Sequence, residues 1–112
     1  MIVATPAPPY VAVIFTSQRT DDDVAGYAAM ADEMERQAAT QPGYLGIESA
    51  RGDDGFGITV SYWRDAAAAR AWKAVADHLG AQRLGRERWY RAYRVRVAEV
   101  AREYGFDRDS MV

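Results

Sequence analysis

The stretch Tyr10-Val-Ala-Val-Ile-Phe-Thr-Ser17 decides the fold. Its β-branched and aromatic residues are typical of a β-strand, in which successive side chains point to opposite faces of a sheet. Both faces of this strand are apolar, with Val11, Val13 and Phe15 on one and Tyr10, Ala12 and Ile14 on the other. Such a strand requires cover on both sides of its sheet.

A helix is predicted after this strand, from Thr20-Asp-Asp-Asp23 to a stop near Gln41-Pro-Gly43. Hydroxyl and carboxylate side chains cap the free N–H groups of a first helical turn, and proline with glycine ends a helix. Apolar residues recur here every three or four positions, which predicts a stripe that faces the core. The stripe consists of Val24, Tyr27, Ala28, Ala31, Met34 and Ala38.

Two further strands are predicted at Tyr44–Ala50 and Phe56–Trp63, joined by the tight turn Arg51-Gly-Asp-Asp-Gly55. Asp-Gly favours the positive φ that short hairpins require. In the second of these strands large apolar and aromatic residues at 56, 58, 60 and 62 alternate with Gly57, Thr59, Ser61 and Trp63, which is a strong strand signal. Gly46 and Gly57 lie inside the strands, where glycine marks a close approach of neighbouring groups. We therefore expect both positions to accept larger residues poorly.

The second half of the chain predicts a helical region and a last strand. Asp65 is a good N-cap for a helix over Ala66–Ala76, and Asp77 is predicted to break that helix and to cap a second segment through about Arg88. The last strand is predicted from about Trp89 to Val100, with apolar residues alternating with arginines.

The predicted order is β-α-β-β-α-β, a ferredoxin-like α+β fold with an antiparallel sheet and its helices on one face. We expect the domain to span residues 10–103, with a loose N-terminal arm at 1–9 and a C-terminal tail at 104–112. Two helices cover only one face of the sheet, although the first strand is apolar on both. The bare face therefore predicts a homodimer.

The composition is that of an ordinary globular domain, with 112 residues, 49% hydrophobic and 27% charged side chains. Neither a membrane-spanning run nor a secretory leader is present, so no membrane association is expected. The lack of cysteine excludes disulfides and thiolate chemistry and makes the cytoplasm the expected compartment. Most basic side chains follow residue 60, and they suit an anion-binding patch or a solvated helix with interface arginines. No nucleic-acid-binding motif accompanies them, so no nucleic acid is expected as a partner.

Four segments resemble the antibiotic biosynthesis monooxygenase family: Pro42–Ser49, Tyr62–Asp65, Ala71–Gln82 and Gly85–Val97. The likeness extends over residues 10–103 and implies a dimer whose sheets pack into an α+β barrel. Members include cofactor-independent oxygenases of aromatic polyketides and haem-degrading monooxygenases. The haem degraders combine an asparagine on the first strand with a tryptophan and a histidine in the later helical region. Here the corresponding stretch is Phe15-Thr-Ser-Gln18, and the chain contains no asparagine.

His78 and Trp72 are the candidate catalytic residues. His78 is the only histidine and is either a general base near neutral pH, a haem ligand or a surface residue. Trp72 lies in the same segment of the resemblance and is the best candidate for a pocket wall. Six residues of continuous helix turn through about 600°, which places the two on different faces. They share a pocket only if the helix breaks at Asp77.

The candidate substrate-binding residues are of two kinds. Aromatic residues form a pocket for a flat aromatic ligand or belong to the core; they are Tyr27, Tyr62, Trp63 and Trp89. Gln82 and Arg86 either hydrogen-bond a substrate oxygen or carboxylate, or lie on an exposed helix face. The glycines match no nucleotide-binding fingerprint and no metal-ligand cluster is evident, so no cofactor and no metal are expected.

Three functions are consistent with these residues. The first is a cofactor-independent monooxygenase that acts on an electron-rich aromatic or quinone-type small molecule held between tryptophans and tyrosines. The second is a non-catalytic dimer that binds a small apolar ligand, and the third is a haem-binding or haem-degrading protein with His78 as the iron ligand.

Overall fold

A computed structural model describes residues 2–109, except for the side chains of Ala81 and Gln82. The elements in chain order are β1 (Tyr10–Arg19), α1 (Val24–Ala38), β2 (Tyr44–Arg51), β3 (Phe56–Trp63), α2 (Ala66–His78), α3 (Ala81–Leu84), the π-helical turn η1 (Gly85–Trp89) and β4 (Tyr90–Val100). The strands form one antiparallel sheet in the order β2-β3-β1-β4. The predicted ferredoxin-like α+β fold is confirmed.

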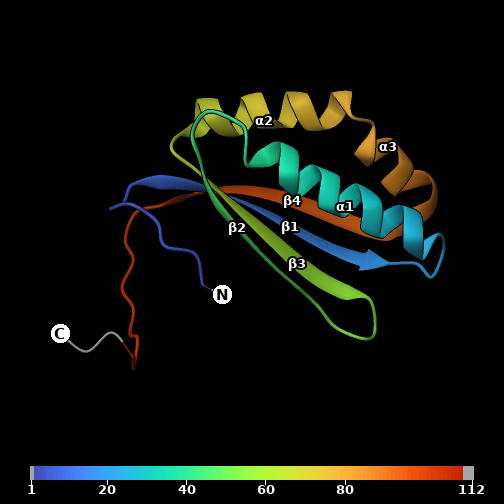
Figure 1. Cartoon of the computed structure of the whole chain (residues 1–112), viewed down its shortest axis with the longest axis horizontal. Helices are drawn as coiled ribbons and strands as arrows, with labels where there is room; N and C mark the ends of the chain where they lie inside the picture. The colour runs from blue at the N-terminus through green and yellow to red at the C-terminus, as the bar shows by residue number, and fades with distance from the viewer. Residues whose placement is uncertain (1, 110–112) are drawn as a thin grey trace.

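The helices all lie on one side of the sheet, as Figure 1 shows. Val11 and Trp63 are directly opposite each other in the β1–β3 pair and point to this covered side, where they pack with small residues of the helices. Those residues are Ala38, Ala68 and Ala69. Trp63 is fully buried, and its indole N–H donates to the Ser61 hydroxyl at 2.9 Å. Alanines let the helices approach closely enough to enclose so large a ring.

Among residues 2–109, no helix covers the other side of the sheet (Figure 1). Strand pairing places Ile14 opposite Val60, and Thr16 opposite Ile58, on this open face. Phe56 and Ile58 there are 48% and 41% exposed. The apolar residues of β3 on this face therefore lie beside the second apolar face of β1, and together they form one apolar surface. The alternation in the sequence of β3 predicts this arrangement.

The apolar stripe of α1 is narrower in the structure than the sequence predicts. Ala38 is buried, and Tyr27 and Met34 are half-buried. The remaining three predicted members, Val24, Ala28 and Ala31, are exposed. The helix begins as expected in the acidic run, where the Asp23 carboxylate accepts the Gly26 N–H at 3.2 Å.

The predicted helix break at Asp77 is wrong, because α2 continues through His78. The Asp77 carboxylate forms an i,i+4 ion pair with Lys73 at 2.7 Å, which supports the helix instead of capping a new one. The helix ends at His78, with Leu79 as its C-cap, and the chain then turns at Gly80, whose φ of 76° is readily adopted by glycine and strained for other residues. Trp72 and His78 therefore stand on different sides of one helix.

The segment before β1 passes along the open side of the sheet at β2 (Figure 1). The Val3 N–H donates to the Glu48 carboxylate at 3.0 Å. Gly46 makes room for this contact, because a Cβ at that position would lie 2.3 Å from the Val3 side chain. Part of the expected loose arm therefore contacts the sheet.

Gly57→Val is expected to lower the free energy of unfolding by about 1–3 kcal/mol, as overpacking does. A Cβ at Gly57 would lie 2.9 Å from the Ala50 carbonyl oxygen and 2.7 Å from the Arg51 guanidinium carbon. Gly105→Val is the control, because nothing lies within 4 Å of a Cβ there. Urea unfolding of both variants checks this, and equal midpoints would contradict it.

Candidate functional site

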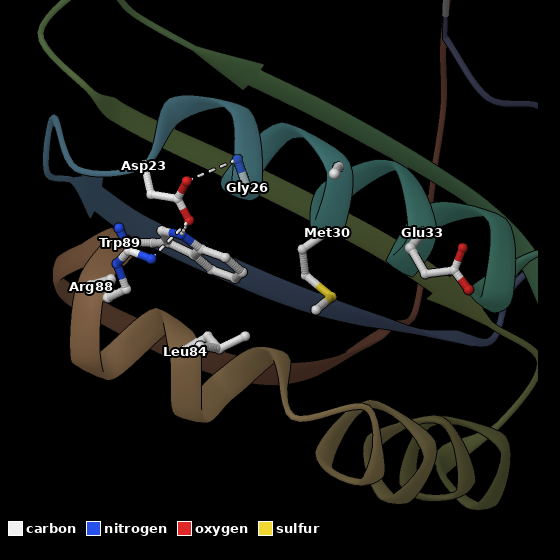
Figure 2. Close-up of a pocket in the computed structure, with 8 residues that line it drawn as sticks. Asp23, Gly26, Met30, Glu33, Leu84, Arg88 and Trp89 are labelled. Carbon is white, nitrogen blue, oxygen red and sulfur yellow. Dashed lines mark hydrogen bonds and ion pairs between the residues drawn. The ribbon is translucent and has the colours of Figure 1, made fainter.

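A groove between α1 and the α3–η1 segment is the best candidate site. Its volume is about 400 Å³. It is lined by Asp23, Gly26, Ala29, Met30, Glu33, Leu84, Arg88 and Trp89, and we call it the Trp89 groove. Figure 2 shows Met30 of α1 and Leu84 of α3 on either side of it, with Trp89 at one end and Glu33 toward the other. Its walls are apolar, and its charged groups lie at the two ends.

Trp89 is held in place by the start of α1. Its indole N–H donates to the Asp23 carboxylate at 3.2 Å, and its ring meets the Tyr27 ring edge-to-face with centroids 5.9 Å apart. The side chain is only 4% exposed. Its position in the groove is therefore fixed by a hydrogen bond and by ring packing together.

The carboxylates at the Asp23 end are neutralised by Arg88. This guanidinium pairs with Asp22 at 3.0 Å and with Asp23 at 3.3 Å. The hydrogen bond from Arg88 holds the pKa of Asp22 below its usual range, although the group is exposed. At the other end, Glu33 pairs with Arg36 and accepts a hydrogen bond from Gln37 at 2.9 Å.

A cluster of aromatic rings continues from Trp89 toward β4. Tyr27 and Tyr90 meet edge-to-face at 5.8 Å, and Phe15 contacts both Tyr90 and Tyr93 at 5.3 Å. Burial, followed by a hydrogen bond to Tyr27, raises the pKa of Tyr90, so this phenol is neutral at physiological pH. The cluster forms the apolar support behind the groove.

Two arginines surround Tyr27. The Arg19 guanidinium lies over the Tyr27 ring at 3.9 Å, and Arg51 donates to the Tyr27 hydroxyl at 3.2 Å and to Ser17 Oγ at 2.7 Å. Arg19 also donates to the Trp89 carbonyl at 2.6 Å. Neither arginine forms an ion pair with any residue in the described part of the chain. Both guanidinium groups instead interact with backbone carbonyls, hydroxyl groups and the Tyr27 ring.

A second groove of about 400 Å³ lies where η1 passes into β4. It is lined by Arg86, Tyr90, Arg91, Ala92 and Tyr93, and we call it the β4 groove. Arg86 donates to the Tyr93 hydroxyl at 3.1 Å. The two grooves share no lining residue.

The structure brings together only some of the predicted site residues. Tyr27 and Trp89 are in contact, whereas Arg86 lines the separate β4 groove. Trp63 and Trp72 stack on each other at 5.8 Å in the core. The side chain of Gln82 lies outside the described residues.

Tyr62 and His78 lie elsewhere. Tyr62 points to the open face, where its hydroxyl donates to Glu48 at 2.7 Å. His78 is exposed at the end of α2. Neither of the two described grooves is lined by Trp72 or His78.

Sequence reasoning missed most of the groove itself. No motif in the sequence marks Met30, Glu33 or Leu84 as groove residues. Arg19 and Arg51, which surround Tyr27, are distant from one another in the sequence. The acidic run that caps α1 did contain one lining residue, Asp23. Among residues 2–109, no cluster of three histidine, cysteine or acidic side chains could hold a metal ion, and no helix there is long and apolar enough to cross a membrane.

The chain belongs to the antibiotic biosynthesis monooxygenase family, whose sequence profile matches residues 10–84. It is 47% identical over 106 residues to the uncharacterized protein YqjZ of Bacillus subtilis strain 168, covering 95% of this chain and 92% of that protein. Proteins of the family are commonly dimeric.

Solved structures show the same fold. SnoaB of Streptomyces nogalater, described as a cofactor-independent oxygenase, superposes with a TM-score of 0.71 at 17% identity over 87% of this chain and 97% of its own. Rv0793 of Mycobacterium tuberculosis has a TM-score of 0.73 at 20% identity over 86% and 99%. The fold is thus that of a monooxygenase-type family.

Tyr62→Phe is expected to cost stability at neutral pH and to cost less in alkali. Burial and the hydrogen bond to Glu48 raise the pKa of Tyr62 from 10.0 to about 12. The contribution of the hydroxyl, on the order of 1 kcal/mol, is therefore fully present below pH 10 and is lost as pH rises toward about 12.

Urea unfolding across this pH range measures the effect as the difference between wild type and variant. The matched control is Tyr104→Phe, since Tyr104 is 92% exposed. A stability gap for Tyr62→Phe that stays constant up to the highest pH would contradict the assignment.

Proposed function

We propose that the protein is a cofactor-independent monooxygenase that oxidises an electron-rich aromatic small molecule in the Trp89 groove. The observation that carries this proposal is the fixed indole of Trp89 beside Met30 and Leu84, with carboxylates at both ends of an apolar groove. Flat rings bind well to an immobile aromatic wall, and polar groups at the ends of a pocket orient them.

A volume of about 400 Å³ is in the range of small-molecule sites. Hydroxyl groups of a polyphenol or anthrone-type substrate would donate to Asp23 or Glu33. Asp23 already accepts from Trp89, Arg88 and Gly26, so few of its lone pairs remain free for a substrate hydroxyl. Glu33 has two partners, Gln37 and Arg36, where Asp23 has three, and we assign the proton-accepting role to Glu33 as the less engaged carboxylate.

The reaction balances without a further oxidant. Loss of one proton from a ring CH₂ group gives a resonance-stabilised carbanion, which passes one electron to O₂ and forms a substrate radical with superoxide. Their coupling gives a peroxide anion. The peroxide anion takes up one proton; removal of the second C–H proton then forms the C=O bond as the O–O bond breaks, and the expelled hydroxide takes up the other proton, which gives a ketone and water. The residues of the groove contribute binding, orientation and the first proton transfer.

Oxygen uptake with an anthrone-type compound tests the site. Ala29→Phe fills the groove and is expected to abolish uptake, whereas Ala28→Phe leaves it unchanged because the neighbouring, exposed Ala28 does not line the groove. Glu33→Gln is expected to reduce the rate about a hundredfold, the usual contribution of a general base. Glu35→Gln, on the same helix outside the groove, is the control.

Each other outcome is informative. Uptake that survives Ala29→Phe contradicts the site. Loss in His78→Ala with full activity in Glu33→Gln would return the role of base to His78. Ligand binding without oxygen uptake by the wild type would instead establish the non-catalytic alternative.

We further propose that the open face of the sheet pairs with a second copy of the chain. It presents Phe56 and Ile58, both exposed, and its charges are arranged for self-pairing. Glu48 lies on β2, whereas Arg94 and Arg96 lie on β4 at the opposite edge. A two-fold axis at the centre of the face would bring the arginines of one copy toward the glutamate of the other.

Light scattering of the wild type is expected to give twice the chain mass of 12.5 kDa. Ile58→Arg places a charge in the middle of the proposed interface and is expected to shift the protein to the monomer mass. Val24→Arg is the control, since Val24 is exposed on α1 on the other side of the sheet. A monomeric wild type at micromolar concentration would contradict the dimer.

A further inference from the structure

We propose that the β4 groove is a second binding site, specific for a small aromatic carboxylate. It is formed where the chain passes from η1 into β4, and no residue of it belongs to the Trp89 groove. The proposal is independent of the oxygenation proposed above.

The first observation is the charge of the groove. Four arginines occur within nine residues of this segment, and two of them are in ion pairs: Arg83 with Glu87, and Arg88 with Asp22 and Asp23. The other two, Arg86 and Arg91, line the groove, and neither forms an ion pair with a residue in the described part of the chain. None of the five described residues that line the groove is acidic. The two arginines of this segment without an ion-pair partner in the described part of the chain therefore both line the β4 groove.

The second observation is a β-bulge that aims Arg91. Gln18 pairs with Ala92 and Arg19 pairs with Tyr90, so Arg91 is the extra residue without a partner on β1. A bulge bends its strand and redirects a side chain, and bulges are frequent beside functional sites. Here the redirected residue lines the groove together with Arg86, which η1 supplies.

The third observation is the tyrosine lining. Tyr93 is fixed by stacking on Phe15 at 5.3 Å, and its hydroxyl accepts from Arg86 at 3.1 Å. The guanidinium of Arg86 is therefore already oriented before a ligand arrives, which lowers the entropy cost of binding. Its remaining N–H groups can bind a carboxylate in the bidentate manner that arginine favours. The tyrosine rings offer a flat apolar surface for the ring of the same ligand.

These features select the ligand class. Two guanidiniums select an anion, and the tyrosines distinguish an aromatic acid from an aliphatic one. The ligand is therefore expected to carry a carboxylate directly on, or one carbon away from, an aromatic ring.

Calorimetric titration of the full chain with benzoate at low ionic strength tests the proposal. Benzoate is expected to bind, whereas benzamide, which has the same shape without the charge, and acetate, which lacks the ring, are expected to bind at least about tenfold more weakly. Arg86→Gln and Arg91→Gln are each expected to weaken benzoate binding by about tenfold. Arg83→Gln, which changes an already paired arginine, leaves it unchanged.

A second control locates the site. Ala29→Phe fills the Trp89 groove and is expected to leave benzoate binding unchanged. Loss of binding in that variant would place benzoate in the other groove and overturn the proposal. Equal binding of acetate, benzoate and inorganic phosphate would overturn the aromatic specificity. Absence of benzoate binding in a wild type that is folded by circular dichroism would overturn the site itself.

Discussion

The position of β1 between β3 and β4 is the constraint on which the rest of the structure depends. The two faces of this strand serve different parts of the molecule, the helix-covered side with Val11 and Phe15 and the open side with Ile14. Val11 packs in the core, Phe15 supports the aromatic cluster, and Ile14 lies on the open face. Because side chains alternate with a period of two, a slip of one residue would exchange these roles completely. Two-sided hydrogen bonding to neighbours fixes the register against such a slip.

The candidate site depends on a junction, by which we mean the hydrogen bonds that join Arg19 and Thr20, at the end of β1, to the carbonyls of Arg88 and Trp89. The Trp89 carbonyl accepts from Arg19 at 2.6 Å and from the Thr20 N–H at 2.8 Å, and the Arg88 carbonyl accepts from the Thr20 hydroxyl at 2.6 Å. Asp23, just beyond, caps α1 and holds the Trp89 indole. Residues nearly seventy positions apart in the chain are thereby locked together, and α1 and η1 become the two walls of one groove.

The fold could be predicted from the sequence because each strand carries its own local pattern. The alternation of Phe56–Trp63 and the apolar run on both faces of β1 can each be recognised within a stretch of eight to ten residues, without knowledge of distant contacts. The site could be predicted only in part, because it is made by contacts between distant segments. Tyr27 and Trp89 were conspicuous as large aromatic residues, but nothing local shows that Arg19 and Arg51 surround one of them. The predicted helix break at Asp77 is wrong for a related reason. Aspartate often caps a helix, but here Asp77 forms an ion pair with Lys73 one turn earlier in the same helix.

The junction also explains how one short segment serves two surfaces. In η1 the π-helical turn and in β4 the bulge at Arg91 each depart from regular geometry, and both devices redirect side chains. Arg88 and Trp89 consequently face the Trp89 groove, whereas Arg86, Tyr90 and Arg91 face the β4 groove. Allosteric coupling requires an element with two arrangements that both ligands bias. Here the backbone between the grooves is held by hydrogen bonds from Arg19, at the end of β1, and from Thr20, the next residue, to two successive carbonyls, and the ring of Trp89 is buried. The geometry therefore favours two independent sites over a switch between them.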